Sequence, residues 1–90
     1  MAKAEISWKR TTAEGVRLQI YAHHVGRAWR FFVRERRYDQ WQGVANPPLE
    51  DWLELRDAVR RRINRRLLRP EEEARVNNSI RERFPEAELD

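Results

Sequence analysis

The sequence contains no cysteine, so neither a disulfide nor a thiolate metal site can stabilise this 90-residue chain. It has only three glycines, and they do not form the glycine-rich loop that holds phosphate groups in nucleotide-binding enzymes. No apolar run approaches the roughly 18 residues that a membrane-spanning helix requires. The lack of an apolar run of this length predicts no membrane partner. The lack of cysteine fits a reducing compartment, so we expect a cytoplasmic protein.

Apolar residues are also scarce, since charged residues make up 38% of the chain and the mean hydropathy is −0.98. The charges are unevenly divided along the sequence. Residues 1–70 carry 16 Lys or Arg and 8 Asp or Glu, whereas residues 71–90 carry 3 Arg and 7 acids. The excess of positive charge in residues 1–70 attracts polyanions. All cations except Lys3 and Lys9 are arginine, which binds phosphate and stacks on flat rings, although a GC-rich genome would produce the same bias.

Hydrophobic periodicity predicts an α+β fold. Apolar residues alternate with polar ones in four short segments, which favours strands joined by hairpin-length turns. These segments are residues 5–10, 16–24, 27–37 and 40–44. In the fourth segment, either Trp41 or Val44 would face the core. We therefore expect one domain over residues 1–90: a three- or four-stranded antiparallel β-meander at 5–45, one long C-terminal amphipathic helix at 47–69, and a short acidic helix and tail at 70–90.

The expected long helix begins at Pro47 and Pro48, since proline is well suited to a first helical turn. Five apolar residues follow at helical spacing and form one stripe: Trp52, Leu55, Val59, Ile63 and Leu67. This stripe would cover the apolar face of the sheet. A helix of about 21 residues would be roughly 31 Å long and would overhang a four-stranded sheet, so we expect a homodimer formed through its distal turns. The intervening arginines either form a solvated face paired with the acids of residues 71–90 or bind a membrane surface or a calmodulin-like partner.

The outward face of the second and third strands carries the strongest functional signal. Phe32 follows Phe31, and because adjacent strand residues point to opposite faces, both cannot lie in the core. Cations that neutralise phosphates, interleaved with rings that stack on bases, are typical of single-stranded nucleic-acid binding. The alternatives are a solvated face with an incidental aromatic residue, or Phe32 at a dimer interface. The candidate binding residues are Lys9, Arg17, Tyr21, His23, Arg30, Phe32, Arg34 and Arg36.

Enzyme chemistry is not indicated. His23 and His24 are adjacent, so their side chains diverge and cannot share one metal ion. Ser7 and Ser79 lack the histidine and aspartate pattern that activates a nucleophile. We therefore expect no catalytic residue, no metal, no cofactor and no small-molecule substrate.

Two motifs resemble a known family. The segments VRERRY at 33–38 and VANPPLEDWLEL at 44–55 are similar to a strand and a helix start in the transcriptional coactivator family known as positive cofactor four and its bacterial relatives. The resemblance to the bacterial relatives implies a bacterial protein. The resemblance covers roughly residues 5–66, and Pro70–Asp90 has no counterpart. It implies a curved four-stranded sheet, a helix that dimerises, and binding of single-stranded or unwound DNA through basic and aromatic sheet residues. Here these would be Arg17, Tyr21, Arg30, Phe32, Arg34 and Arg36.

The sequence thus predicts a non-enzymatic nucleic-acid-binding protein that favours single-stranded DNA and acts in transcription regulation. The alternative is a small homodimeric protein-interaction module with no nucleic-acid role.

Overall fold

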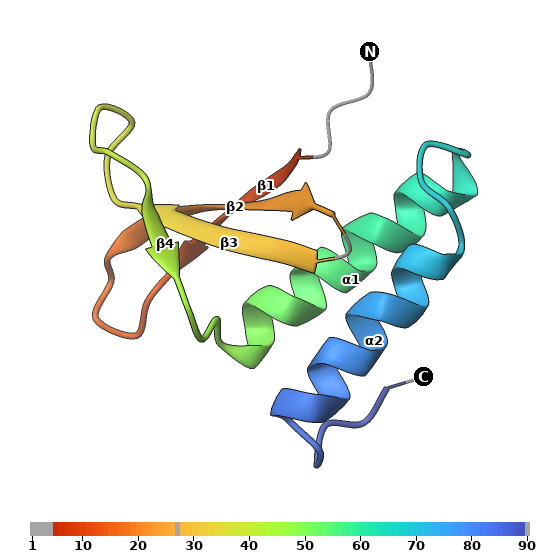
Figure 1. The fold of residues 1–90 in the computed structure, drawn as a ribbon. Coiled ribbons are helices and arrows are strands. Elements are labelled where there is room, and N and C mark those ends of the chain that lie inside the picture. The colour runs from red at the N-terminus through yellow and green to blue at the C-terminus, as the bar shows by residue number, and fades with distance from the viewer. Residues whose placement is uncertain (1–4, 27, 90) are drawn as a thin grey trace. The chain divides into compact units, whose positions relative to one another are not determined.

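The computed structural model describes residues 5–26 and 28–89, which divide into two compact units that meet in sequence between Pro47 and Pro48 (Figure 1). The first unit holds four strands and the second holds two helices. These are β1 (Glu5–Thr11), β2 (Arg17–Val25), β3 (Ala28–Arg34), β4 (Gln42–Val44), α1 (Leu49–Asn64) and α2 (Glu71–Arg83). The predicted α+β class is confirmed, with the longer helix first. The single domain and the packing of the helix on the sheet stay predictions.

The strands form one antiparallel sheet in the order β1-β2-β3-β4, which is the predicted meander with the fourth strand present. Gly15 and Gly26 make the first two reversals possible, since both adopt positive φ, at 87° and 60°. The β1–β2 turn is closed by the Gly15 N–H, which donates to the Thr12 carbonyl at 2.9 Å. Short turns therefore fix the register of the sheet.

The register separates the sheet into two faces, as the alternation predicts. Ile6 lies opposite Ala22, and Ala22 lies opposite Phe31, so these three side chains share one face. The buried residues of this face are Ile6, Ile20, Ala22, Trp29 and Phe31. Trp8 meets the Phe31 ring edge-on at 6.1 Å between ring centroids. This face is the apolar one, and the opposite face carries the candidate binding residues.

β3 ends at Arg34, three residues before the predicted end of that strand. Asp39 explains the early stop, because its Oδ2 accepts from the Arg36 backbone N–H at 3.1 Å. The Asp39 N–H in turn donates to the Arg36 carbonyl at 2.9 Å. Aspartate side chains commonly divert the backbone from a sheet ladder into a turn in this way. Arg36 consequently lies in the β3–β4 loop instead of on the strand.

α2 packs against α1 within the helical unit, so the acidic segment that follows Pro70 is held by its own chain. Val76 and Ile80 are fully buried. The Arg56 Nε donates to Asn77 Oδ1 at 2.6 Å, and the Arg60 Nε pairs with Glu73 Oε2 at 2.6 Å. The arginine run on α1 is thus partly explained by contacts with α2. Neither helix, over the described residues, is long and apolar enough to cross a membrane.

α1 spans Leu49–Asn64, so the predicted helix over 47–69 begins two residues too early and ends five residues too late. Arg66 has φ of 62°, and its N–H donates to the Ile63 carbonyl at 2.9 Å. The Leu67 N–H donates to the Arg62 carbonyl at 2.8 Å. These two bonds make a Schellman C-cap, which glycine usually forms and which the sequence therefore did not reveal. Of the predicted stripe, Trp52, Leu55 and Val59 are buried and Ile63 is half-buried, but Leu67 lies beyond the helix and is 53% exposed.

Replacing Arg66 with glycine should stabilise the chain. The left-handed conformation costs an L residue energy that glycine avoids, partly offset by the greater freedom of glycine in the unfolded chain. We expect the free energy of unfolding to rise by about 0.5–1 kcal/mol, measured by urea denaturation. Arg65→Gly is the matched control, since Arg65 has φ of −91° and gains nothing from glycine. Equal effects from both variants would contradict the capping argument.

Candidate nucleic-acid interface

Seven of the eight predicted binding residues share the sheet face opposite the apolar one. Tyr21 of β2 lies opposite Phe32 of β3, and His23 lies opposite Arg30. Gln19 forms the same kind of pair with Arg34, and on the other side of β2 it pairs with Lys9. The register therefore brings together Lys9, Arg17, Tyr21, His23, Arg30, Phe32 and Arg34. Arg36 is the exception, since it lies in the loop, where its Nη1 donates to the Tyr38 hydroxyl at 3.0 Å.

The centre of this face is a group of three rings, Tyr21, Phe32 and Trp41, which we call the aromatic cluster. The Tyr21 and Phe32 rings stack with centroids 4.8 Å apart and planes 16° apart. Trp41 meets Tyr21 edge-on, at 4.7 Å and 73°. All three are half-buried, so part of each ring remains accessible. Contact between the rings fixes their orientations, and the accessible part of each ring adds apolar surface to a largely polar face.

Gly43 helps to keep the Phe32 ring accessible. It lies opposite Phe32 in the register of β3 and β4. Its missing Cβ would stand 3.9 Å from Phe32 Cε2, in ordinary van der Waals contact. A larger side chain at this position would extend over the ring, whereas glycine leaves it open.

Trp41 is the functional candidate that the sequence did not identify. The prediction placed either Trp41 or Val44 on the apolar face, and the structure places Val44 there, opposite Phe31. Because the two positions are three residues apart in an extended segment, their side chains fall on opposite faces. Assigning Val44 to the core would therefore have assigned Trp41 to the face of Tyr21 and Phe32.

Arg34 joins the aromatic cluster to the cations of the same face. Its guanidinium carbon lies 4.2 Å from the centroid of the Trp41 ring, a cation–π contact. Its Nε donates to Gln19 Oε1 at 2.8 Å. These two contacts hold the guanidinium group over the indole, and the hydrogen bond to Gln19 uses only its Nε, so the terminal nitrogens can act on a ligand. Around this centre, Lys9, Arg17 and Arg30 are exposed.

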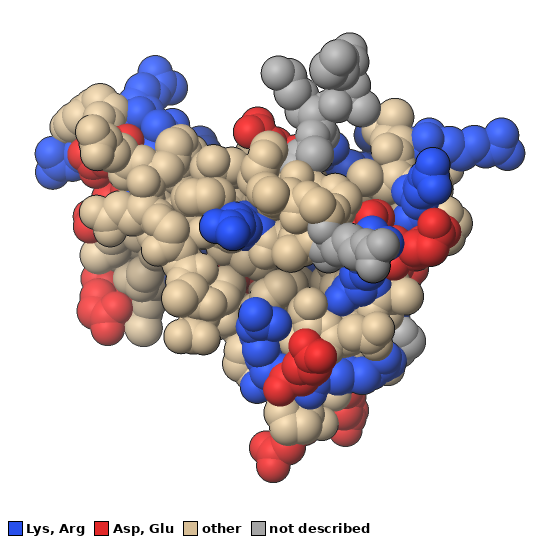
Figure 2. Space-filling view, in the orientation of Figure 1, with Lys and Arg blue, Asp and Glu red and all other residues tan. Residues whose placement is uncertain are grey.

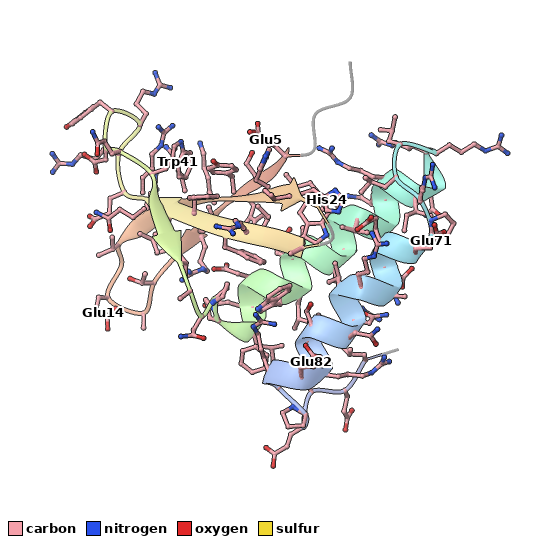
Figure 3. All side chains as sticks on the ribbon, viewed as in Figure 1. Glu5, Glu14, His24, Trp41, Glu71 and Glu82 are labelled. Atoms are coloured by element: carbon pink, nitrogen blue, oxygen red, sulfur yellow. The ribbon has the colours of Figure 1, made fainter. Side chains whose placement is uncertain are left out.

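The face is not uniformly basic, because Glu5 lies on it. Glu5 is opposite His23 in the register, and its Oε2 is 3.5 Å from His23 Nδ1. A shallow hollow beside the aromatic cluster is lined by Glu5, Ser7, Tyr21 and Trp41. Figure 3 shows Glu5 and Trp41 projecting on the same side of the sheet. The arrangement thus combines flat rings, exposed cations and one carboxylate.

Several charges of the helical unit are paired with each other. Figure 2 shows acidic and basic side chains interspersed over the helices in that view. Arg61 pairs with Asp57, as their spacing of four residues predicts, and Arg75 pairs with Glu72 at 2.8 Å. Such pairs stabilise a helix and neutralise much of its charge. The described residues contain no group of three or more His, Asp or Glu side chains that could hold a metal ion.

Comparisons with known proteins give no match for this chain, so the site is interpreted from its geometry. The chain matches no family model, no curated protein sequence and no solved structure.

Proposed function

We propose that this chain is a non-enzymatic protein that binds single-stranded nucleic acid, with DNA favoured, through the sheet face that carries the aromatic cluster. The observation behind the proposal is the contact of Arg34 with Trp41, beside the stacked rings of Tyr21 and Phe32. Unstacked bases gain about 1–3 kcal/mol each on such rings, and arginine adds cation–π attraction to the base and charge for the phosphate. The resemblance of the 33–38 and 44–55 segments to the positive cofactor four family points to the same chemistry and to transcription regulation in the cytoplasm of a bacterium.

Preference for single strands follows from the kind of surface that the rings offer. In a duplex the base faces are stacked on one another, so only phosphates and groove edges meet a protein. A single strand can turn its bases onto Tyr21, Phe32 and Trp41, while Lys9 and Arg30 neutralise its phosphates. A surface that bound only by charge would not make this distinction.

Fluorescence anisotropy with labelled single-stranded and duplex oligonucleotides, across a salt series, tests the proposal. We expect tighter binding of the single strand, with an affinity that falls steeply as salt increases. Equal binding of both forms would show that the site binds nucleic acid through charge alone. A lack of binding to either form at low salt would overturn the proposal.

Arg30→Ala should flatten the salt dependence without removing the preference for single strands. Arg30 is exposed on the ring-bearing face, opposite His23. Loss of one phosphate contact reduces the slope of log affinity against log salt by about 0.7 for a single strand. Arg81→Ala, at an exposed site in α2, removes the same charge and should leave the slope closer to wild type. Equal slopes for the two variants would contradict a role for Arg30.

A homodimeric protein-interaction module is the second candidate, and exposed apolar residues of the helical unit favour it. Leu53 is 39% exposed and Leu67 is 53% exposed, so a second copy could bury both. Dimerisation is also compatible with nucleic-acid binding. Sedimentation velocity at several protein concentrations tests the homodimer. Self-association that is insensitive to salt and to added oligonucleotide would favour the interaction module alone.

A further inference from the structure

The hollow beside the aromatic cluster has the chemistry to select one kind of base. Tyr21 and Trp41 form apolar walls, while Glu5 and Ser7 add a carboxylate and a hydroxyl. Ser7 lies directly opposite Tyr21 in the register, so the polar groups lie beside the rings and on the same face. A base stacked on Tyr21 would therefore present one of its edges to Glu5 and Ser7.

Glu5 is unexpected on a surface that binds phosphates, because its negative charge repels them. Its side chain is 51% exposed, and its contact with His23 Nδ1 is 3.5 Å long, so carboxylate oxygen remains available to a ligand. A carboxylate can accept two hydrogen bonds side by side. Its presence is explained if the ligand offers two adjacent N–H donors at this position.

Among the four bases, only guanine carries two adjacent donors on its Watson–Crick edge, N1–H and the exocyclic N2–H. Adenine and cytosine pair one amino donor with a ring-nitrogen acceptor, and thymine places its single donor between two carbonyls. Those acceptors would face the Glu5 carboxylate unfavourably. Bases that are unstacked from their neighbours are commonly read on this edge while they stack on an aromatic side chain.

We propose that the Glu5–Ser7–Tyr21–Trp41 hollow is a guanine-selective subsite, a proposal that rests on the single-strand binding function proposed above. Tyr21 and Trp41 hold the base by stacking and edge contact, Glu5 accepts from N1–H and N2–H, and Ser7 supplies a further hydroxyl at the rim. The protein would then bind many single strands and place a guanine at one position.

Competition anisotropy with thymidine 12-mers tests the selectivity. One 12-mer is all thymine, and three others replace a central thymine with guanine, 7-deazaguanine or inosine. A single guanine avoids folded guanine-rich structures. We expect guanine and 7-deazaguanine, which share both donors, to tighten binding about tenfold, whereas inosine, which lacks N2–H, loses most of that gain.

Glu5→Gln should remove the guanine preference, and binding of the all-thymine strand should become tighter because a negative charge is lost from the face. Glu14→Gln is the matched control: it removes the same charge from the exposed β1–β2 turn, away from Trp41 in Figure 3, and should keep the preference. If the all-thymine strand binds and guanine adds nothing, or if the preference survives Glu5→Gln, the guanine subsite is wrong and the binding function stands. If no 12-mer binds at low salt, the binding function fails and the subsite with it.

Discussion

Replacing Trp41 with alanine should weaken binding of a single-stranded oligonucleotide by about 5- to 150-fold, the equivalent of about 1–3 kcal/mol for one stacked base. The indole contacts Tyr21 on one side and the Arg34 guanidinium on another. Its removal therefore deletes a stacking surface and also frees Arg34 from the orientation that the ring imposes. We expect the affinity to fall about evenly across sequences that lack guanine, since every base has a flat face.

Trp41→Phe is the matched variant, because it retains an aromatic ring at the same position. It should recover most of the affinity that alanine loses. The comparison separates stacking from a change in fold, provided that both variants show the same far-ultraviolet circular dichroism and similar thermal unfolding midpoints. Wild-type affinity in Trp41→Ala would remove Trp41 from the site and leave charge as the main source of binding.

The sheet was predictable from the sequence because its alternation is local and its turns carry clear signals. Gly15 and Gly26 stand where the chain reverses, and the alternation of Ile20, Tyr21 and Ala22 fixes which side chains face the core. These two constraints are enough to determine the register of neighbouring hairpins. The same alternation placed seven of the eight candidate binding residues on one face.

The misses have a different origin, since the alternation of apolar residues does not determine where an element begins or ends. The Asp39 side chain ends β3 early and moves Arg36 into a loop. Arg66 takes a left-handed conformation that sequence rules reserve for glycine, so the end of α1 was placed too late. Trp41 was ambiguous because β4 is only three residues long and begins after it. In the first two cases, one side chain or one cap determines the boundary of an element.

Alanine variants of the adjacent residues Phe31 and Phe32 should separate an effect on stability from an effect on binding. Phe31 is 3% exposed and meets Trp8 edge-on, so Phe31→Ala should lower the free energy of unfolding by about 3–5 kcal/mol. That loss is a large fraction of the roughly 5–15 kcal/mol by which proteins are stable. Urea denaturation followed by tryptophan fluorescence measures it.

Phe32→Ala should reduce the affinity for a single strand more than it reduces the free energy of unfolding. The Phe32 ring is half-buried and its main contact is the stack on Tyr21, which contributes about 0.5–1.5 kcal/mol beyond area burial. We expect a smaller change in stability than for Phe31→Ala, but a 5- to 150-fold loss of single-strand affinity, again about 1–3 kcal/mol for one base. Greater destabilisation by Phe32→Ala than by Phe31→Ala would reverse the assignment of the two faces. Undiminished binding in a folded Phe32→Ala variant would show that the Phe32 ring has no role in recognition, because loss of a ring that stacks on a base must weaken binding of that base.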